Sequence, residues 1–136
     1  VYPVHLNPQV KSVVEARLGS APAIHLIPPV EYVQMVALMR ACHLVLTDSG
    51  GIQEEAPALG RPVLVMREVT ERPEAVATGV AQLVGTDIGA ITGAVARLLE
   101  DEAHYRSRAR AVFPYGDGKA AGRIAASIAR FVKVRA

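Results

Sequence analysis

Residues 49–51, Ser49-Gly50-Gly51, stand where an apolar run ends and a helix is expected to begin. Because Gly50 and Gly51 have no Cβ atom, a phosphate could approach the backbone N–H groups that are left unpaired at a helix start. Glu55 lies four residues after Gly51, on the same helix face, where its carboxylate could accept hydrogen bonds from sugar hydroxyls. This arrangement outlines a site for a nucleotide diphosphate. One alternative stays open, because many α/β domains place these residues at a helix start purely for packing.

Two further positions carry groups that suit anion or sugar binding. Arg72 could hold a diphosphate through its guanidinium, or it could form a local ion pair with Glu71 or Glu74. His5, between two apolar residues, could contact a ligand or bond to the turn that follows it. Both alternatives stay open for each residue.

Other patterns of catalytic or metal-binding residues are missing from the sequence. No Cys/His cluster predicts a metal site, and no Ser/His/Asp order predicts acyl transfer. Tyr115 and Asp117 lie in a Pro-Tyr-Gly-Asp-Gly break, where shaping a turn is their default role. We therefore expect neither a metal nor a cofactor.

The elements that position these residues alternate between strand and helix, which predicts an α/β fold with a doubly wound, Rossmann-like parallel sheet. Expected strands cover residues 1–4, 24–27, 43–47, 62–66 and 81–84; expected helices cover 8–18, 31–42, about 50–59, 88–100, 102–111 and 119–134, with a short helix within 67–78. The apolar run 43–47 shows no alternation, which predicts a strand buried on both faces. Ligands of such sheets bind at the carboxyl ends of the strands, where the polar residues singled out above collect.

The amino-acid composition limits the class of protein to which the chain can belong. The 136 residues suit one domain, and 51% are hydrophobic without any uncharged run of membrane-spanning length or a visible signal peptide. A scattered net charge of +2 and 4% aromatic residues argue against nucleic acid as a partner. The single cysteine, Cys42, favours a reducing compartment and a small core residue. We expect a cytoplasmic protein without membrane contact.

Four segments, in this order and spacing, resemble the non-hydrolysing bacterial UDP-N-acetylglucosamine 2-epimerases: VYPVHLNP, TDSGGIQEEAPALGRPVLVMR, TERPEA and PYGDGKA. The resemblance runs from Val1 to about Arg123. It implies the carboxy-terminal half of a two-domain glycosyltransferase-B type fold. Residues 1–118 would form the UDP-binding domain, and residues 119–136 a final helix that crosses to an amino-terminal domain absent from this chain.

The resemblance also implies roles for individual residues: Ser49, Gly50 and Gly51 would hold the UDP phosphates, Glu55 the ribose, Arg72 the diphosphate, and His5 a second UDP-sugar that acts as activator. Val30 and Met35 depart from the family's commoner glutamine and aromatic near the base. Phe113 replaces an asparagine that is usual before Pro-Tyr-Gly-Asp-Gly.

The implied reaction interconverts UDP-N-acetylglucosamine and UDP-N-acetylmannosamine by elimination and re-addition of UDP, for cell-envelope polysaccharide synthesis. In the family the acids and bases at the sugar ring belong to the amino-terminal domain or lie upstream of Val1. We therefore assign no catalytic residue here, and we expect the chain alone to be inactive and the full-length enzyme to be a homodimer. The alternatives are a hydrolysing epimerase or glycosyltransferase domain of the same fold, and a nucleotide-sugar binding module without catalysis.

Overall fold

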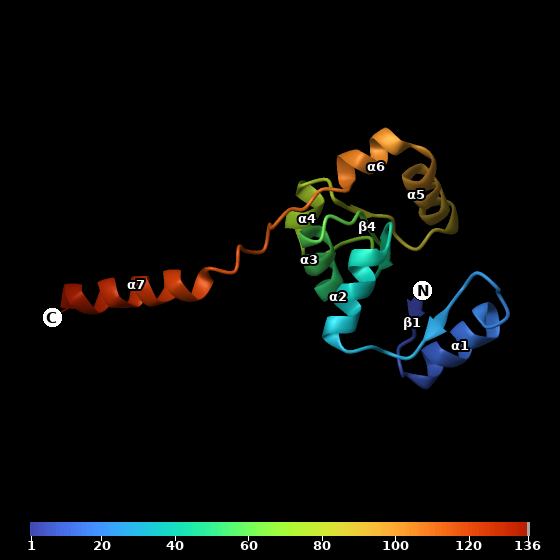
Figure 1. Ribbon diagram of the computed structural model, residues 1–136, viewed down its shortest axis with the longest axis horizontal. Coiled ribbons are helices and arrows are strands. Elements are labelled where there is room, and N and C mark those ends of the chain that lie inside the picture. Colours follow the sequence, from blue (N-terminus) through green and yellow to red (C-terminus); the bar gives the residue numbers. More distant parts are fainter. Residues whose placement is uncertain (136) are drawn as a thin grey trace. The chain divides into compact units, whose positions relative to one another are not determined.

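The computed structural model describes the backbone of residues 1–135 and the side chains of residues 1–132. The chain divides into two compact units, Val1–Leu38 and Met39–Ala136. Figure 1 shows their elements in chain order, and each unit is described by itself. Strands alternate with helices as far as β5, after which three helices follow, and every described strand pair is parallel, so the predicted α/β class with parallel sheets is confirmed.

The first unit contains one parallel strand pair with a helix between the strands. Strand β1 (Tyr2–Pro3) pairs with β2 (Leu26–Ile27), and helix α1 (Pro8–Leu18) connects them. Asn7 caps α1 by accepting a hydrogen bond from the Gln9 N–H at 2.9 Å, and Pro8 occupies the first turn, where its missing N–H costs nothing. Helix α2 (Tyr32–Ala41) then leads into the second unit. The predicted bounds of α1 are confirmed.

The second unit is built on a three-stranded parallel sheet in the order β3-β4-β5. The strands are β3 (Val45–Thr47), β4 (Val63–Val65) and β5 (Ala81–Leu83); the helices are α3 (Gly50–Ala58), α4 (Pro73–Ala77), α5 (Ile88–Glu100), α6 (Glu102–Arg108) and α7 (Ala120–Arg135). Because β3 and β4 are parallel neighbours, the loops that follow them leave the same edge of the sheet. These are the loops that begin α3 and carry Arg72.

The core of the second unit forms around the central strand. All three residues of β4 are buried, and Leu64 packs with Val84, which directly follows β5, and with Leu98 of α5. Strand β3 differs from the prediction: Leu46 is 41% exposed, so this strand is not buried on both faces. The reason is its place in the sheet, since β3 lies at an edge whereas β4 has neighbours on both sides.

Helix α3 begins and ends where the sequence predicts. Its N-cap is Ser49, and its last turn closes at Gly60, whose φ of +70° lies in the left-handed region that favours glycine. Glu54 and Glu55 fall in the second turn, because the helix starts at Gly50. They therefore lie beyond the first turn, where the positive end of the helix dipole acts most strongly.

The carboxy-terminal elements differ in how well they were predicted. Helix α5 has its predicted bounds, whereas α6 ends at Arg108 instead of Ala111. The chain leaves the helix there because the N–H of Val112 bonds to the carbonyl of Pro57, at 3.0 Å. Helix α7 keeps an apolar stripe exposed, with Ile124 and Ile128 each at 58%. The boundary at residue 118 and the crossing of this helix to another domain stay predictions.

No helix within the described residues is both long and apolar enough to cross a bilayer.

Candidate functional site

The start of helix α3 carries backbone donors that nothing nearby satisfies. The N–H of Ser49 bonds to the Thr47 hydroxyl at 3.0 Å, and that of Gln53 bonds to the Ser49 carbonyl at 3.3 Å. The Ser49 side chain makes no capping bond. In the described part of the chain the N–H groups of Gly50, Gly51 and Ile52, which lie between these two, have no acceptor. A helix start in this state presents three donors and a positive dipole end to an anion.

The two glycines test the alternative that this turn serves only packing. Neither has a positive φ, so the backbone conformation does not require glycine. A Cβ at Gly51 would have only the Ser49 hydroxyl nearby, at 4.0 Å, among the described residues. A Cβ at Gly50 would meet only the Glu71 carboxylate, at 2.9 Å. Packing within this structure therefore does not explain Gly51, whereas close approach of a ligand does.

The two consecutive glutamates of α3 have different surroundings. Glu54 forms an ion pair with Arg72, whose Nε donates to Glu54 Oε1. Glu55 is half-buried and has no hydrogen bond or ion pair among the described residues. Successive helix residues point about 100° apart, so the two carboxylates face different groups. Of the two, Glu55 is therefore the carboxylate without a described partner, and its contact with a ligand stays a prediction.

Arg72 is held beside α3 and not by its sequence neighbours. Of the two alternatives for Arg72, the local ion pair with Glu71 or Glu74 is not formed: the carboxylate partner is Glu54, and towards Glu71 the guanidinium donates only to the backbone carbonyl, at 3.3 Å. The hydrogen bond to Glu54 is the main reason why the pKa of Arg72 is raised above its ordinary value. The Arg72 guanidinium therefore lies beside helix α3, the helix that begins at the Ser-Gly-Gly turn. A diphosphate bound there would meet a permanent positive charge.

Glu71 pairs with a different arginine. Its carboxylate bonds to Arg67 at 3.0 Å, and its own backbone N–H is the chief cause of a pKa below the ordinary value. The group stays ionised and lies close to Gly50.

Three residues that sequence reasoning did not assign to the site position its loops. Gln53 is buried, at 1% exposure, and bonds to both Ser49 and Thr70. The Tyr115 hydroxyl donates to the Arg72 carbonyl and accepts from the Ala75 N–H, each at 3.1 Å. Burial raises the pKa of Tyr115, which keeps its proton available for the Arg72 carbonyl. Tyr115 therefore does more than shape a turn, and only its place beside the Pro-Tyr-Gly-Asp-Gly break could have indicated this.

Asp117 connects the same break to the last helix. Its carboxylate accepts from the Lys119 N–H at 3.1 Å and binds both terminal nitrogens of Arg123, at 3.0 and 2.5 Å. The hydrogen bonds from Arg123 are the main cause of the lowered pKa of Asp117. The start of α7 is thereby fixed to the loop that carries Tyr115.

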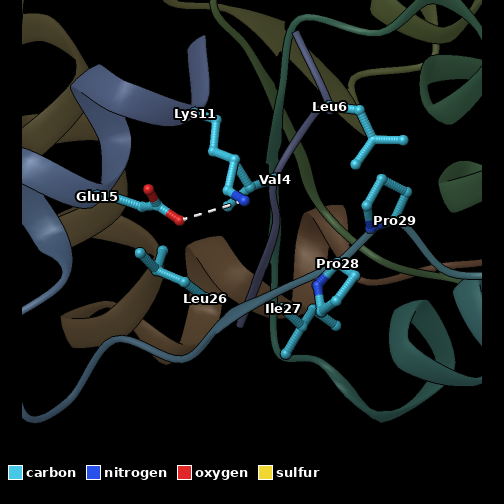
Figure 2. Close-up of a pocket in the computed structure, with 8 residues that line it drawn as sticks. All are labelled: Val4, Leu6, Lys11, Glu15, Leu26, Ile27, Pro28 and Pro29. Carbon is cyan, nitrogen blue, oxygen red and sulfur yellow. Dashed lines mark ion pairs between the residues drawn. The ribbon is translucent and has the colours of Figure 1, made fainter. Parts of the chain in front are cut away.

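His5 lies in the first unit. Its Nδ1 accepts a hydrogen bond from the Asn7 N–H at 3.1 Å, so the predicted bond to the following turn is confirmed. In the neutral ring this bond places the proton on Nε2, which can donate to a ligand. The neighbours Val4 and Leu6 line a largely apolar cavity of about 260 Å³, bordered by a Lys11–Glu15 ion pair at 3.7 Å (Figure 2).

Cys42 is half-buried, its thiol donates to the Met39 carbonyl, and burial raises its pKa, so it is not a reactive thiolate.

Comparison with known proteins identifies the group to which this fold and site belong. A family model described as UDP-N-acetylglucosamine 2-epimerase matches residues 1–129. The chain belongs to the UDP-N-acetylglucosamine 2-epimerase family. An Escherichia coli UDP-N-acetylglucosamine 2-epimerase is 58% identical over 124 residues, which are 91% of this chain and 33% of the relative.

Solved structures of the family share the fold. A UDP-GlcNAc 2-epimerase from Neisseria meningitidis bound to UDP-GlcNAc has a TM-score of 0.89 and 46% identity, and covers 94% of this chain and 34% of that one. An S. aureus co-structure with UDP has a TM-score of 0.89 and 43% identity, and covers 97% and 36%. The chain therefore spans about a third of the length of the 2-epimerases that it matches.

Proposed function

We propose that this chain is the UDP-binding part of an epimerase that interconverts UDP-N-acetylglucosamine and UDP-N-acetylmannosamine by elimination and re-addition of UDP. The observation that carries the proposal is the open start of α3. Gly51 is glycine although neither its backbone conformation nor its described neighbours require it. One helical turn later, Glu55 offers a carboxylate without a partner among the described residues. The ligands named for the Neisseria and S. aureus structures support UDP as the bound group.

The proposed contacts follow from the chemistry of each group. The N–H groups of Gly50 and Gly51 would donate to the phosphate oxygens, Ser49 would add its hydroxyl, and Arg72 would neutralise the diphosphate. Glu55 would accept hydrogen bonds from the ribose hydroxyls. As UDP leaves the sugar, charge develops on the diphosphate, and donors fixed in place beforehand stabilise it without reorganising.

The acids and bases at the sugar ring are proposed to lie outside this chain, which holds about a third of the length of its relatives. An amino-terminal domain would supply them. The exposed stripe of α7 that includes Ile124 and Ile128 would pack against that domain. We further propose that the whole enzyme is a cytoplasmic homodimer and that His5, through Nε2, contacts a second UDP-sugar that acts as activator.

Calorimetric titration of UDP and of CDP into the intact protein tests the proposal. We expect UDP to bind and the 136-residue chain alone to leave C2 of UDP-N-acetylglucosamine uninverted when the sugar is followed by NMR. Absence of UDP binding would contradict the nucleotide site. Inversion by the chain alone, above a mock-purified control, would contradict the assignment of the ring chemistry to other residues.

A further inference from the structure

A buried side-chain amide connects the two loops of the proposed diphosphate site. Gln53 is 1% exposed, although glutamine is a residue type that is seldom fully buried. Its Nε2 donates to the Ser49 carbonyl at 3.2 Å, and its Oε1 accepts from the Thr70 hydroxyl at 2.6 Å. One amide therefore bonds to the turn before α3 and to the loop after β4.

The hydrogen-bond roles in this connection are fixed by the partners. The Ser49 carbonyl can only accept, so the amide must turn its NH₂ towards it and its oxygen towards Thr70. The Thr70 hydroxyl then donates its single proton to Gln53 and uses a lone pair to accept the Arg72 N–H at 3.0 Å. Reversing the amide would place two oxygens against each other at Ser49. Only one assignment of donors and acceptors therefore satisfies all the hydrogen bonds from Ser49 through Gln53 and Thr70 to Arg72.

We infer that Gln53 is a positioning residue that, through Thr70, sets the spacing between the Ser-Gly-Gly turn and Arg72 for a diphosphate. The inference rests on the proposed function of those two groups. Gln53 itself touches no ligand in this account, because it is buried beneath the turn that it supports. A ligand that contacts both loops at once binds well only when the distance between the loops is correct. A change in that distance therefore weakens the binding of ligands that span both loops.

The need to contact both loops distinguishes a diphosphate ligand from a monophosphate ligand. UDP has two phosphates and can contact the α3 turn and Arg72 together, whereas UMP has one phosphate. Loosening the link should therefore weaken UDP much more than UMP. General damage to the fold would weaken both ligands alike.

The chain offers a matched control at the other end of helix α4. The Thr78 hydroxyl donates to the Ala75 carbonyl at 2.7 Å and accepts the Val80 N–H at 3.4 Å. Like Thr70, Thr78 is half-buried and accepts from the backbone N–H two residues later. Thr78 has no bond to Gln53.

The experiment measures UDP and UMP affinities by calorimetry for the intact protein and its variants. We expect Thr70→Val to weaken UDP about tenfold, the effect of one hydrogen bond, with UMP changed by less than about twofold. Thr70→Ser, which keeps the hydroxyl, and Thr78→Val should bind UDP as the unchanged protein does. If circular dichroism shows that Thr70→Val is unfolded, Gln53→Leu takes its place, with the same selective loss expected.

Each other outcome overturns a defined part of the account. Unchanged UDP binding by Thr70→Val, equal losses of UDP and UMP, or an equal loss in Thr78→Val would overturn the positioning role. Failure of the unchanged protein to prefer UDP over UMP, or unchanged UDP binding by Arg72→Ala, would instead overturn the proposed site itself. The two failures are distinct because the second is measured without altering Gln53 or Thr70.

Discussion

Helices α3 and α5 begin alike in the sequence but differ in how their first turns are satisfied. Each follows a strand of the same parallel sheet, and each has a glycine as its second residue, Gly51 in α3 and Gly89 in α5. In α5 the Asp87 carboxylate accepts from the Ala90 N–H at 2.8 Å. In α3 the Ser49 hydroxyl makes no such bond.

The start of α5 is therefore capped by its own chain, whereas the start of α3 leaves backbone donors for a further group. A Cβ at Gly89 would lie 3.2 Å from the capping oxygen of Asp87, whereas at Gly51 the space is open apart from Ser49. Both helices carry the same backbone dipole, so an anion could approach either in principle. Asp87 already supplies a negative group at α5. At α3 the Glu71 carboxylate lies beside Gly50, but it is paired with Arg67 and accepts from no described N–H group of the first turn, so these donors remain for a ligand.

Gly51→Ala should produce the largest change. The added methyl group would occupy the space proposed for a phosphate, and we expect UDP binding to weaken by about 3 kcal/mol, the upper end of the range for hydrogen bonds to a charged group. The free energy of unfolding should stay the same or rise by up to about 1 kcal/mol, because alanine favours a helix more than glycine does. Gly89→Ala is the matched control and should leave UDP binding unchanged. Equal effects of the two variants on UDP would break the distinction between the helices.

Glu55→Ala should weaken UDP binding by roughly 1.5–3 kcal/mol, because a charged acceptor of the ribose hydroxyls is lost. Glu54→Ala is the neighbouring control. Its ion pair with Arg72 is about a third exposed at each side chain, with values of 36% and 35%, so we expect a smaller change in UDP affinity. A larger loss in Glu54→Ala, measured by the same titration, would mean that α3 presents its other face to the ligand.

Asp87→Ala should lower the free energy of unfolding by about 1 kcal/mol, the usual effect of losing an N-cap. Urea denaturation measures it, and UDP affinity should not change, because α5 is not part of the proposed site. A change in UDP binding comparable to that of Gly51→Ala would contradict the separation of the two helix starts.

Ser49→Ala should have the smallest effect on stability, within about 0.5 kcal/mol in urea denaturation, because its hydroxyl caps nothing in the structure. UDP binding should nevertheless weaken if the hydroxyl reaches a phosphate. A stability loss as large as that of Asp87→Ala would show that Ser49 caps α3 in solution and would make the two helix starts equivalent.

The sequence predicted the elements whose ends carry local signals. Asn7 before Pro8 and Asp87 before Ile88 mark helix starts through their own capping bonds, and both starts were predicted to the residue. Helix α6 was predicted too long because its end depends on a distant bond, from Val112 to Pro57. Local patterns do not contain that information.

The same limit applies to the site. The glycines and Glu55 could be proposed as site residues because their spacing follows from helix geometry. Gln53 reads as an ordinary polar helix residue, and its burial depends on Thr70, which lies 17 positions away along the chain. Tyr115 bonds to Arg72 across 43 positions. The groups that would touch the ligand were therefore accessible to sequence reasoning, whereas the groups that hold them were not.

The most direct test of the α3 site is an amide NMR titration of the intact protein with UDP. We expect the backbone N–H resonances of Gly50 and Gly51 to move strongly as they donate to phosphate oxygens, while that of Gly89 stays in place. UDP binding that leaves Gly50 and Gly51 unmoved, or that moves Gly89 as much, would contradict the claim that the open start of α3 holds the diphosphate.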